Sequence, residues 1–254
     1  MTILPSTRAT LPSTRSGSTG LTEFRERLLA TAQARAVQAP LGRGRLIFAL
    51  DATASRMPTW DHAARIQGEM FEATAALGGL DVQLCYYRGF AECKVSRWLS
   101  TAGELHRVMR GVSCLGGETQ IERVLTQTIR QATSAHLGAL IFVGDAVEEK
   151  VDRLCQLAGE LGRYQVPLFM FFEASDDPDA PHSLAVFQEL ARLTRGDCLS
   201  FNLQSAANLK ELLGAIAVFA TGNTSALLAY GQKKGGEVLR LTSRLRRLSA
   251  EGGP

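Results

Sequence analysis

The stretch RLIFALDATASRM, residues 45–57, decides the fold and marks its candidate functional edge. Its first half is an apolar run that ends at Asp51, and two hydroxyl residues follow at alternate positions, Thr53 and Ser55. A short apolar run bounded by polar residues is typical of a strand buried on both faces of a sheet. We therefore expect a buried strand that ends by presenting a carboxylate and two alcohols on one short turn.

The chain beyond this stretch alternates strand patterns with helix patterns. The apolar runs GALIFVG and VPLFMFF predict two more buried strands, DCLSFN predicts another, and DVQLCYYR followed by KVSRWL predicts a hairpin. Helical patterns separate these strands, over residues 60–77, 100–110, 118–133, 148–163, 182–194 and 205–221. Strands joined by helices of this length need crossover connections and run parallel. The prediction is an α/β fold, doubly wound, with a mainly parallel sheet, one antiparallel edge strand and helices on both faces.

The two ends of the chain differ in composition from the middle. Residues 1–19 contain LPSTR twice and are rich in Ser, Thr and Pro, which predicts a flexible arm. We expect an N-terminal helix and linker over 20–43 and the α/β domain over 44–220. Residues 221–254 read as a linker and a basic amphipathic helix, whose apolar face consists of Val238, Leu241, Leu245 and Leu248. This helix could dock on its own domain, on a second copy in self-association, on an acidic partner or on a membrane surface; the first two are the options we favour.

Composition narrows the class of protein. Five cysteines are scattered without CxxC spacing, which predicts reduced thiols and a cytoplasmic protein. No apolar run approaches the roughly 18 residues of a membrane span, and the N-terminus lacks the apolar region of a secretory signal; its Ser, Thr and Arg content faintly resembles an organelle transit peptide. Both ends are basic and the middle is mildly acidic, without the dense basic face of a nucleic-acid binder.

Five oxygen-bearing residues are expected to meet at one edge of the sheet. Asp51, Thr53 and Ser55 follow the first strand, Thr119 follows the glycine-rich CLGG, and Asp145 follows a later apolar strand. Ligands of open parallel sheets collect at the carboxyl ends of the strands. Carboxylate and hydroxyl oxygens are hard ligands that suit Mg²⁺, and they also accept Mn²⁺ or Ca²⁺.

This pattern resembles the metal-ion-dependent adhesion site of the von Willebrand factor A (VWA) domain family, and the match covers residues 44–220. The resemblance implies a Rossmann-like VWA fold in which Asp51, Thr53, Ser55, Thr119 and Asp145 coordinate a divalent cation. It also implies a protein partner whose Asp or Glu side chain completes the ion's shell. Thr53 stands where Ser is commoner, which preserves the hydroxyl, and Glu118 directly before Thr119 is an unusual charge.

Other interpretations of the same residues stay open. Asp51, Thr53 and Ser55 could cap the following helix and satisfy turn amides. The chain could be a Mg²⁺-dependent phosphoester-processing enzyme on a related fold, although such an enzyme would require a second Asp at the position of Thr53. P-loop and GxSxG motifs are absent, and none of the four histidines is paired with a nucleophile. We predict an adaptor that is not an enzyme, the remaining alternative being a structural subunit that no longer uses the ion.

Overall fold

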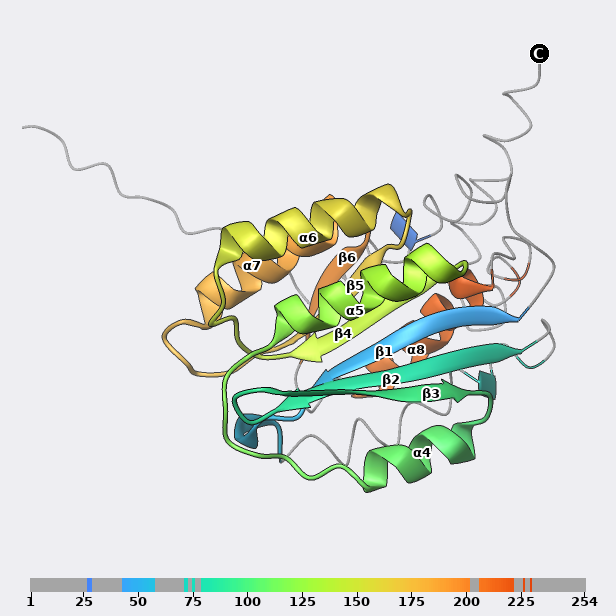
Figure 1. Ribbon diagram of the computed structural model, residues 1–254, viewed down its shortest axis with the longest axis horizontal. Helices are drawn as coiled ribbons and strands as arrows, with labels where there is room; N and C mark the ends of the chain where they lie inside the picture. Colours follow the sequence, from blue (N-terminus) through green and yellow to red (C-terminus); the bar gives the residue numbers. More distant parts are fainter. Residues whose placement is uncertain are drawn as a thin grey trace, which may run out of the picture.

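The computed structural model describes residues 27–28, 43–57, 71–72, 75, 79–201, 206–221, 226 and 229. Six strands in this part of the chain form one sheet in the order β3-β2-β1-β4-β5-β6. Neighbouring strands are parallel except for β2 and β3, which form the antiparallel hairpin at one edge. The predicted mainly parallel sheet with one antiparallel edge strand is therefore confirmed (Figure 1). The strands are β1 (Gly44–Asp51), β2 (Leu80–Arg88), β3 (Glu92–Leu99), β4 (Ala139–Gly144), β5 (Leu168–Glu173) and β6 (Asp197–Phe201).

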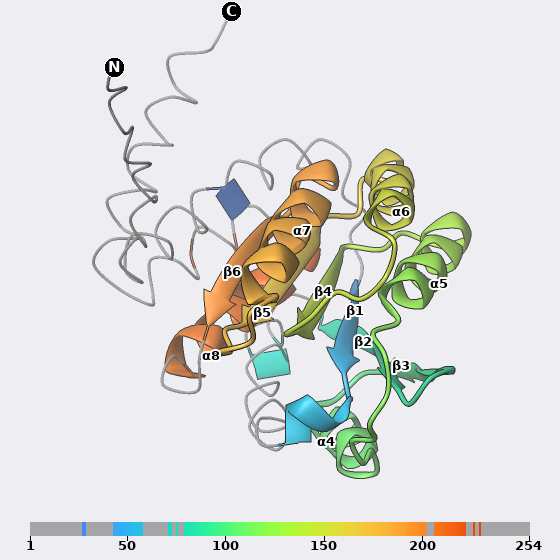
Figure 2. The same cartoon turned by 90° about the vertical axis from the view of Figure 1, so that its left-hand side faces the viewer.

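Helices cover both faces of the sheet, as a doubly wound fold requires. One face packs against α5 (Ile121–Ser134), α6 (Val151–Arg163) and α7 (Ala180–Leu193). The other packs against α4 (Ala102–Arg110) and α8 (Ala206–Ala220). Figure 2 looks onto the edge at which the parallel strands end, with the two helical layers on either side.

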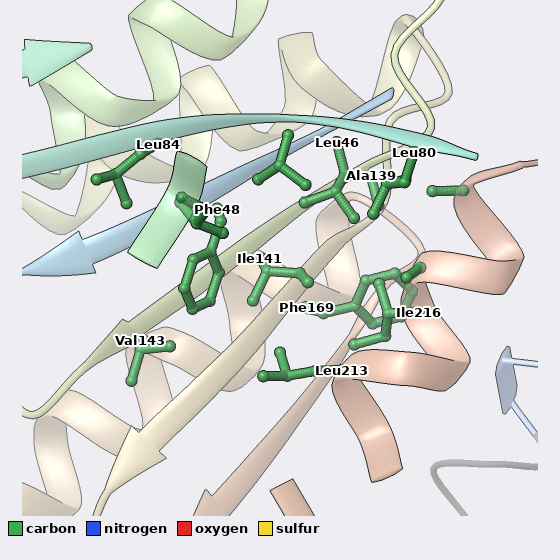
Figure 3. Close-up of a cluster of buried hydrophobic side chains, with 14 of the residues drawn as sticks. Leu46, Phe48, Leu80, Leu84, Ala139, Ile141, Val143, Phe169, Leu213 and Ile216 are labelled. Atoms are coloured by element: carbon green, nitrogen blue, oxygen red, sulfur yellow. The ribbon is translucent and has the colours of Figure 1, made fainter. Parts of the chain in front are cut away.

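Side chains of β1 alternate between two hydrophobic cores. Leu46, Phe48 and Leu50 belong to the cluster on the α8 side, whereas Ile47 and Ala49 belong to the cluster beneath α5 and α6. Because successive side chains of a strand point to opposite faces, a central strand buried on both sides must be continuously apolar. Figure 3 shows the first cluster, in which side chains of the sheet meet Leu213 and Ile216 of α8.

Residues near the N-terminus pack on the domain. Arg27 and Leu28 are helical, Leu28 is only 2% exposed within the α8-side core, and Arg27 Nη1 donates to Asp197 Oδ1 at 2.9 Å. The predicted arm, the C-terminal basic helix and most of the predicted helix over 60–77 lie outside the described residues. Within the described part, no helix is long and apolar enough to cross a membrane.

Several element boundaries differ from the predictions. The hairpin turn is shorter than expected, because β3 already begins at Glu92. The helices expected from 118 and 148 begin at Ile121 and Val151 instead. The physical reason is that Thr119, Glu148 and Glu149 bond to one another, which holds both segments out of the helices. Helix α4 is capped at its N-terminus by Thr101, whose hydroxyl accepts from the amide of Glu104.

Candidate functional site

A chain of oxygens leads from the buried end of β1 to the surface. Asp51, the last residue of β1, is 1% exposed, and its Oδ1 accepts the amide of Thr53 at 2.7 Å. The hydroxyl of Thr53 is hydrogen-bonded to that of Ser55 at 3.1 Å, and Ser55 is exposed. Three of the five predicted site residues are therefore joined on one turn, as the alternate spacing suggested.

The capping interpretation applies to Asp51 but not to the Thr53 hydroxyl. Thr53 precedes the short 3₁₀ helix η1 (Ala54–Arg56), and its side chain makes no capping hydrogen bond there. Asp51 does satisfy the turn amide of Thr53. The helix expected after residue 60 lies outside the described residues, so its capping stays untested.

Tyr87 is a second partner of Asp51 that sequence reasoning missed. Its hydroxyl donates to Asp51 Oδ2 at 3.0 Å, and the two residues are paired in register across β1 and β2. The side chain is fully buried, which together with the charge of Asp51 raises the pKa of Tyr87 well above its usual value. The tyrosine therefore acts as a hydrogen-bond donor that orients the carboxylate. The sequence carries no sign of this beyond an aromatic residue at the end of a strand.

Asp145 follows β4 directly and stands close to Asp51. Burial is the main cause that raises the pKa of Asp51, and the negative charge of Asp145 raises it further. Asp145 Oδ1 is buried and accepts no hydrogen bond from the residues that the structure describes. A buried carboxylate oxygen without a donor is costly unless a cation or water satisfies it. The chemistry of this atom therefore fits a ligand of a cation.

Thr119 is held by two glutamates of the loop after β4. Its amide donates to Glu148 Oε2 at 2.7 Å, and its hydroxyl donates to Glu149 Oε2 at 2.9 Å and accepts from the Glu148 amide at 2.9 Å. Glu149 is close enough to Tyr87 for its charge to raise the tyrosine pKa. Thr119 is thus bonded to Glu149, whose charge acts on Tyr87, the hydrogen-bond donor of Asp51. A direct role of Thr119 at an ion stays a prediction.

The glycine-rich loop before Thr119 approaches the β2–β3 turn closely. A Cβ added at Gly117 would overlap the backbone carbonyl of Gly89. The amide of Leu115 donates to Ala52 O at 3.1 Å, and that of Glu118 donates to Gly89 O at 3.3 Å. These contacts fix the loop over the ends of β1 and β2, which positions Thr119.

Arg56 is the other residue that sequence reasoning missed. It lies on η1, is 3% exposed, and forms an ion pair with Glu173, the last residue of β5. Burial lowers the pKa of Arg56, and the negative charges of Asp145 and Asp51 oppose that shift. A guanidinium is thus buried among the acids of the site. Glu173 begins an acidic stretch at the end of β5, of which residues 174–179 are exposed.

The donor set suits a hard cation that keeps water in its shell. Asp51, Thr53, Ser55 and Asp145 offer carboxylate and hydroxyl oxygens, the ligands that Mg²⁺ accepts. Among the described residues, no three side chains of the types His, Cys, Asp and Glu form a cluster able to hold a metal. An ion in this site would therefore depend on the hydroxyls and on water as well as on the two aspartates.

Solved structures with a similar fold are known. No protein-family model matches the sequence, and no curated protein is detectably similar to it. A von Willebrand factor type A structure from Catenulispora acidiphila superposes with a TM-score of 0.55 at 13% identity, over 70% of this chain and 43% of that one. The SpRpn10 VWA domain gives a TM-score of 0.52 at 11% identity, over 67% of this chain and 95% of the domain.

The pilus adhesin SpaC from Lactobacillus rhamnosus GG gives a TM-score of 0.53 at 11% identity, over 76% of this chain and 31% of the adhesin. The chain thus spans less than half the length of the Catenulispora protein and of the adhesin, but nearly all of the SpRpn10 domain. At these identities the likeness concerns the fold and not the chemistry. The chain has the α/β fold of a VWA domain.

Proposed function

We propose that the protein is a metal-dependent adaptor that binds a partner protein through a divalent cation at the carboxyl ends of β1 and β4. The observation that carries this proposal is the buried Oδ1 of Asp145, which accepts no hydrogen bond from the described residues and stands beside the bonded set of Asp51, Thr53 and Ser55. Mg²⁺ is the expected ion, with Mn²⁺ or Ca²⁺ as possible substitutes.

The site residues differ in exposure, so that one side of the site faces solvent. Asp51 and Thr53 are buried, Asp145 is half-buried and Ser55 is exposed, so an ion bound to them would have one side toward solvent. Few protein ligands are present, which leaves shell positions to water. A carboxylate from a partner can replace such a water and gain a directional, charge-assisted contact. The partner therefore presents an Asp or Glu side chain.

Thr119 belongs to the proposed site through its loop. Its hydroxyl now bonds to Glu149 and to the amide of Glu148. Coordination by Thr119 would require the hydroxyl to exchange the Glu149 carboxylate for the ion or for an ion-bound water. Glu149 also accepts the amide of Glu122 at 2.7 Å, so the carboxylate keeps a partner after such an exchange.

Calorimetric titration of Mg²⁺ and Mn²⁺ into the chelator-treated full-length protein tests the proposal. Asp51→Asn keeps the shape of the side chain and removes its charge, and Glu118→Gln removes an exposed acid from the neighbouring loop as the matched control. We expect binding to the wild type and to Glu118→Gln, and its loss in Asp51→Asn. Equal binding by Asp51→Asn, or no binding to the wild type, would overturn the proposal.

The enzymatic alternative makes a different prediction with the same variants. A Mg²⁺-dependent phosphoester enzyme would turn over a generic aryl phosphate, and Asp51→Asn would abolish that turnover. The adaptor proposal expects no turnover above the Asp51→Asn background. Turnover by the wild type that disappears in the variant would replace the adaptor by the enzyme.

A further inference from the structure

We infer that Arg56 is a built-in cation of this site, which balances Asp51 and Asp145 and competes with a divalent ion for them. The inference deepens the proposed function, on which it rests in taking Asp51 and Asp145 as the acids that an ion would bind. The inference concerns the group that balances the negative charges of Asp51 and Asp145 in the ion-free protein.

The sheet order places Arg56 among the acids. Strand β4 lies between β1 and β5. Arg56 follows β1 and pairs with Glu173 at the end of β5, so its side chain must cross the end of β4, where Asp145 stands. This path brings the guanidinium over the carboxyl ends of three adjacent strands, the same edge that the proposed ion site occupies.

Burial makes the charge balance a strong requirement. The side chains of Asp51 and Arg56 are almost inaccessible to water, and a charge in such surroundings is tolerated only when an opposite charge is close. The ion pair with Glu173 and the charges of Asp145 and Asp51 favour the charged form of Arg56. The guanidinium therefore supplies the positive charge that these aspartates need when no ion is bound.

Asp145 shows that this neutralisation is incomplete. Its Oδ1 accepts no hydrogen bond from the described residues, so the guanidinium acts on that oxygen through its charge alone. The oxygen remains open to an ion, but an ion that reaches it meets the positive charge of Arg56. Like charges in a buried site repel strongly, so an ion that loads here does so against the charge of Arg56, which stays paired with Glu173.

Arg56→Met tests the competition, since it removes the charge and keeps an apolar stem of similar length. Arg56→Lys is the matched control that keeps the charge. We expect Arg56→Met to bind Mn²⁺ at least about tenfold more tightly than the wild type in calorimetry, and Arg56→Lys to bind like the wild type. In chelator the thermal midpoint of Arg56→Met should fall, and saturating Mg²⁺ should restore it; the wild-type midpoint should respond far less.

The outcomes separate this inference from the proposed function. Binding by Arg56→Met but not by the wild type supports the built-in cation and overturns the native ion site. Equal binding by the wild type and Arg56→Met supports the ion site and overturns the competition. Absence of binding in both overturns both proposals.

A further variant covers the case in which Arg56→Met does not fold. Arg56→Met combined with Asp145→Asn and Glu173→Gln removes the guanidinium, one acid of the site and the ion-pair partner of Arg56 together. The charge balance predicts that this combined variant folds where Arg56→Met alone does not. Folding of Arg56→Met only in the presence of Mn²⁺ would support the inference equally. Failure of the combined variant to fold would show that Arg56 is needed for packing, and would overturn its role as a counter-charge.

Discussion

Tyr87 donates its hydroxyl hydrogen bond to Asp51 from the neighbouring strand, at the position where the two residues are paired in register. This bond and the amide of Thr53 occupy different oxygens of the carboxylate, Oδ2 and Oδ1. Asp51 is thereby fixed in orientation from two sides within the sheet. The end of β1 is a preorganised carboxylate and not a mobile surface acid.

Tyr87→Phe should destabilise the protein by about 1–3 kcal/mol, because it leaves Asp51 Oδ2 buried without that donor. The measurement is urea denaturation followed by circular dichroism. Tyr164→Phe is the control, since Tyr164 is exposed at the end of α6 and its change should stay within about 0.5 kcal/mol. A Tyr87→Phe protein as stable as the control would show that the bond contributes nothing.

The pair Gly116 and Gly117 offers a test of how Thr119 is positioned. A Cβ at Gly117 would overlap the carbonyl of Gly89, whereas a Cβ at Gly116 has no atom within 4 Å. We expect Gly117→Ala to cost about 1–3 kcal/mol through displacement of the loop and Gly116→Ala to be neutral. Thermal unfolding of the two variants measures this. Equal midpoints would mean that the loop shifts without cost and that its approach to the hairpin does not position Thr119.

The sequence was sufficient to predict the sheet and the meeting of Asp51, Thr53 and Ser55 at the end of β1, for identifiable reasons. Continuous apolar runs mark strands buried on both faces, and the rule that ligands gather at the carboxyl ends of parallel strands placed Asp51 and Asp145 together. The alternate spacing of Asp51, Thr53 and Ser55 predicted that their oxygens meet, because the turn that joins them is local.

Arg56 and Tyr87 could not be found in the same way, since their roles depend on contacts distant in sequence. An arginine directly after the hydroxyl residues resembles a surface charge until Glu173 of β5 is placed against it. From the sequence alone, Tyr87 looks like an ordinary aromatic residue of the core. Only the register between β1 and β2 shows that it lies opposite Asp51. Glu148 and Glu149, which hold Thr119, likewise resemble the first residues of a helix, because the local sequence has the pattern of one.

Leu28 should contribute strongly to stability although it precedes the sheet by many residues. It is buried in the α8-side core, and a large-to-small change there removes apolar contacts and leaves a cavity. We expect Leu28→Ala to lower the free energy of unfolding by about 2–4 kcal/mol. Leu115→Ala, at an exposed leucine, serves as the control in the same urea titration. A Leu28→Ala change as small as that of the control would indicate that the domain does not depend on this contact.

The five cysteines are thiols in the structure, and two of them interact across the hairpin. Sγ of buried Cys85 lies 3.9 Å from Sγ of half-buried Cys93. The hydrogen bond with Cys85 is the main cause that lowers the pKa of Cys93 below its usual value, and the charge of Arg123 adds to it. Burial, in contrast, raises the pKa of Cys198 to about 12. The same hydrogen bond and burial raise the pKa of Cys85, so Cys93 is the thiol of the pair that forms a thiolate more readily.

Iodoacetamide should label Cys93 well before Cys198, because the thiolate is the reacting form. With a lowered pKa, Cys93 forms its thiolate at a lower pH than an ordinary thiol, whereas Cys198 gains its thiolate only as the pH rises toward 12. Peptide-level mass spectrometry of timed labelling across a pH series measures both rates. Cys85→Ala removes the hydrogen-bond partner of Cys93 and should move the Cys93 labelling curve to higher pH. An unchanged curve in that variant would show that the thiol pair does not set the reactivity of Cys93.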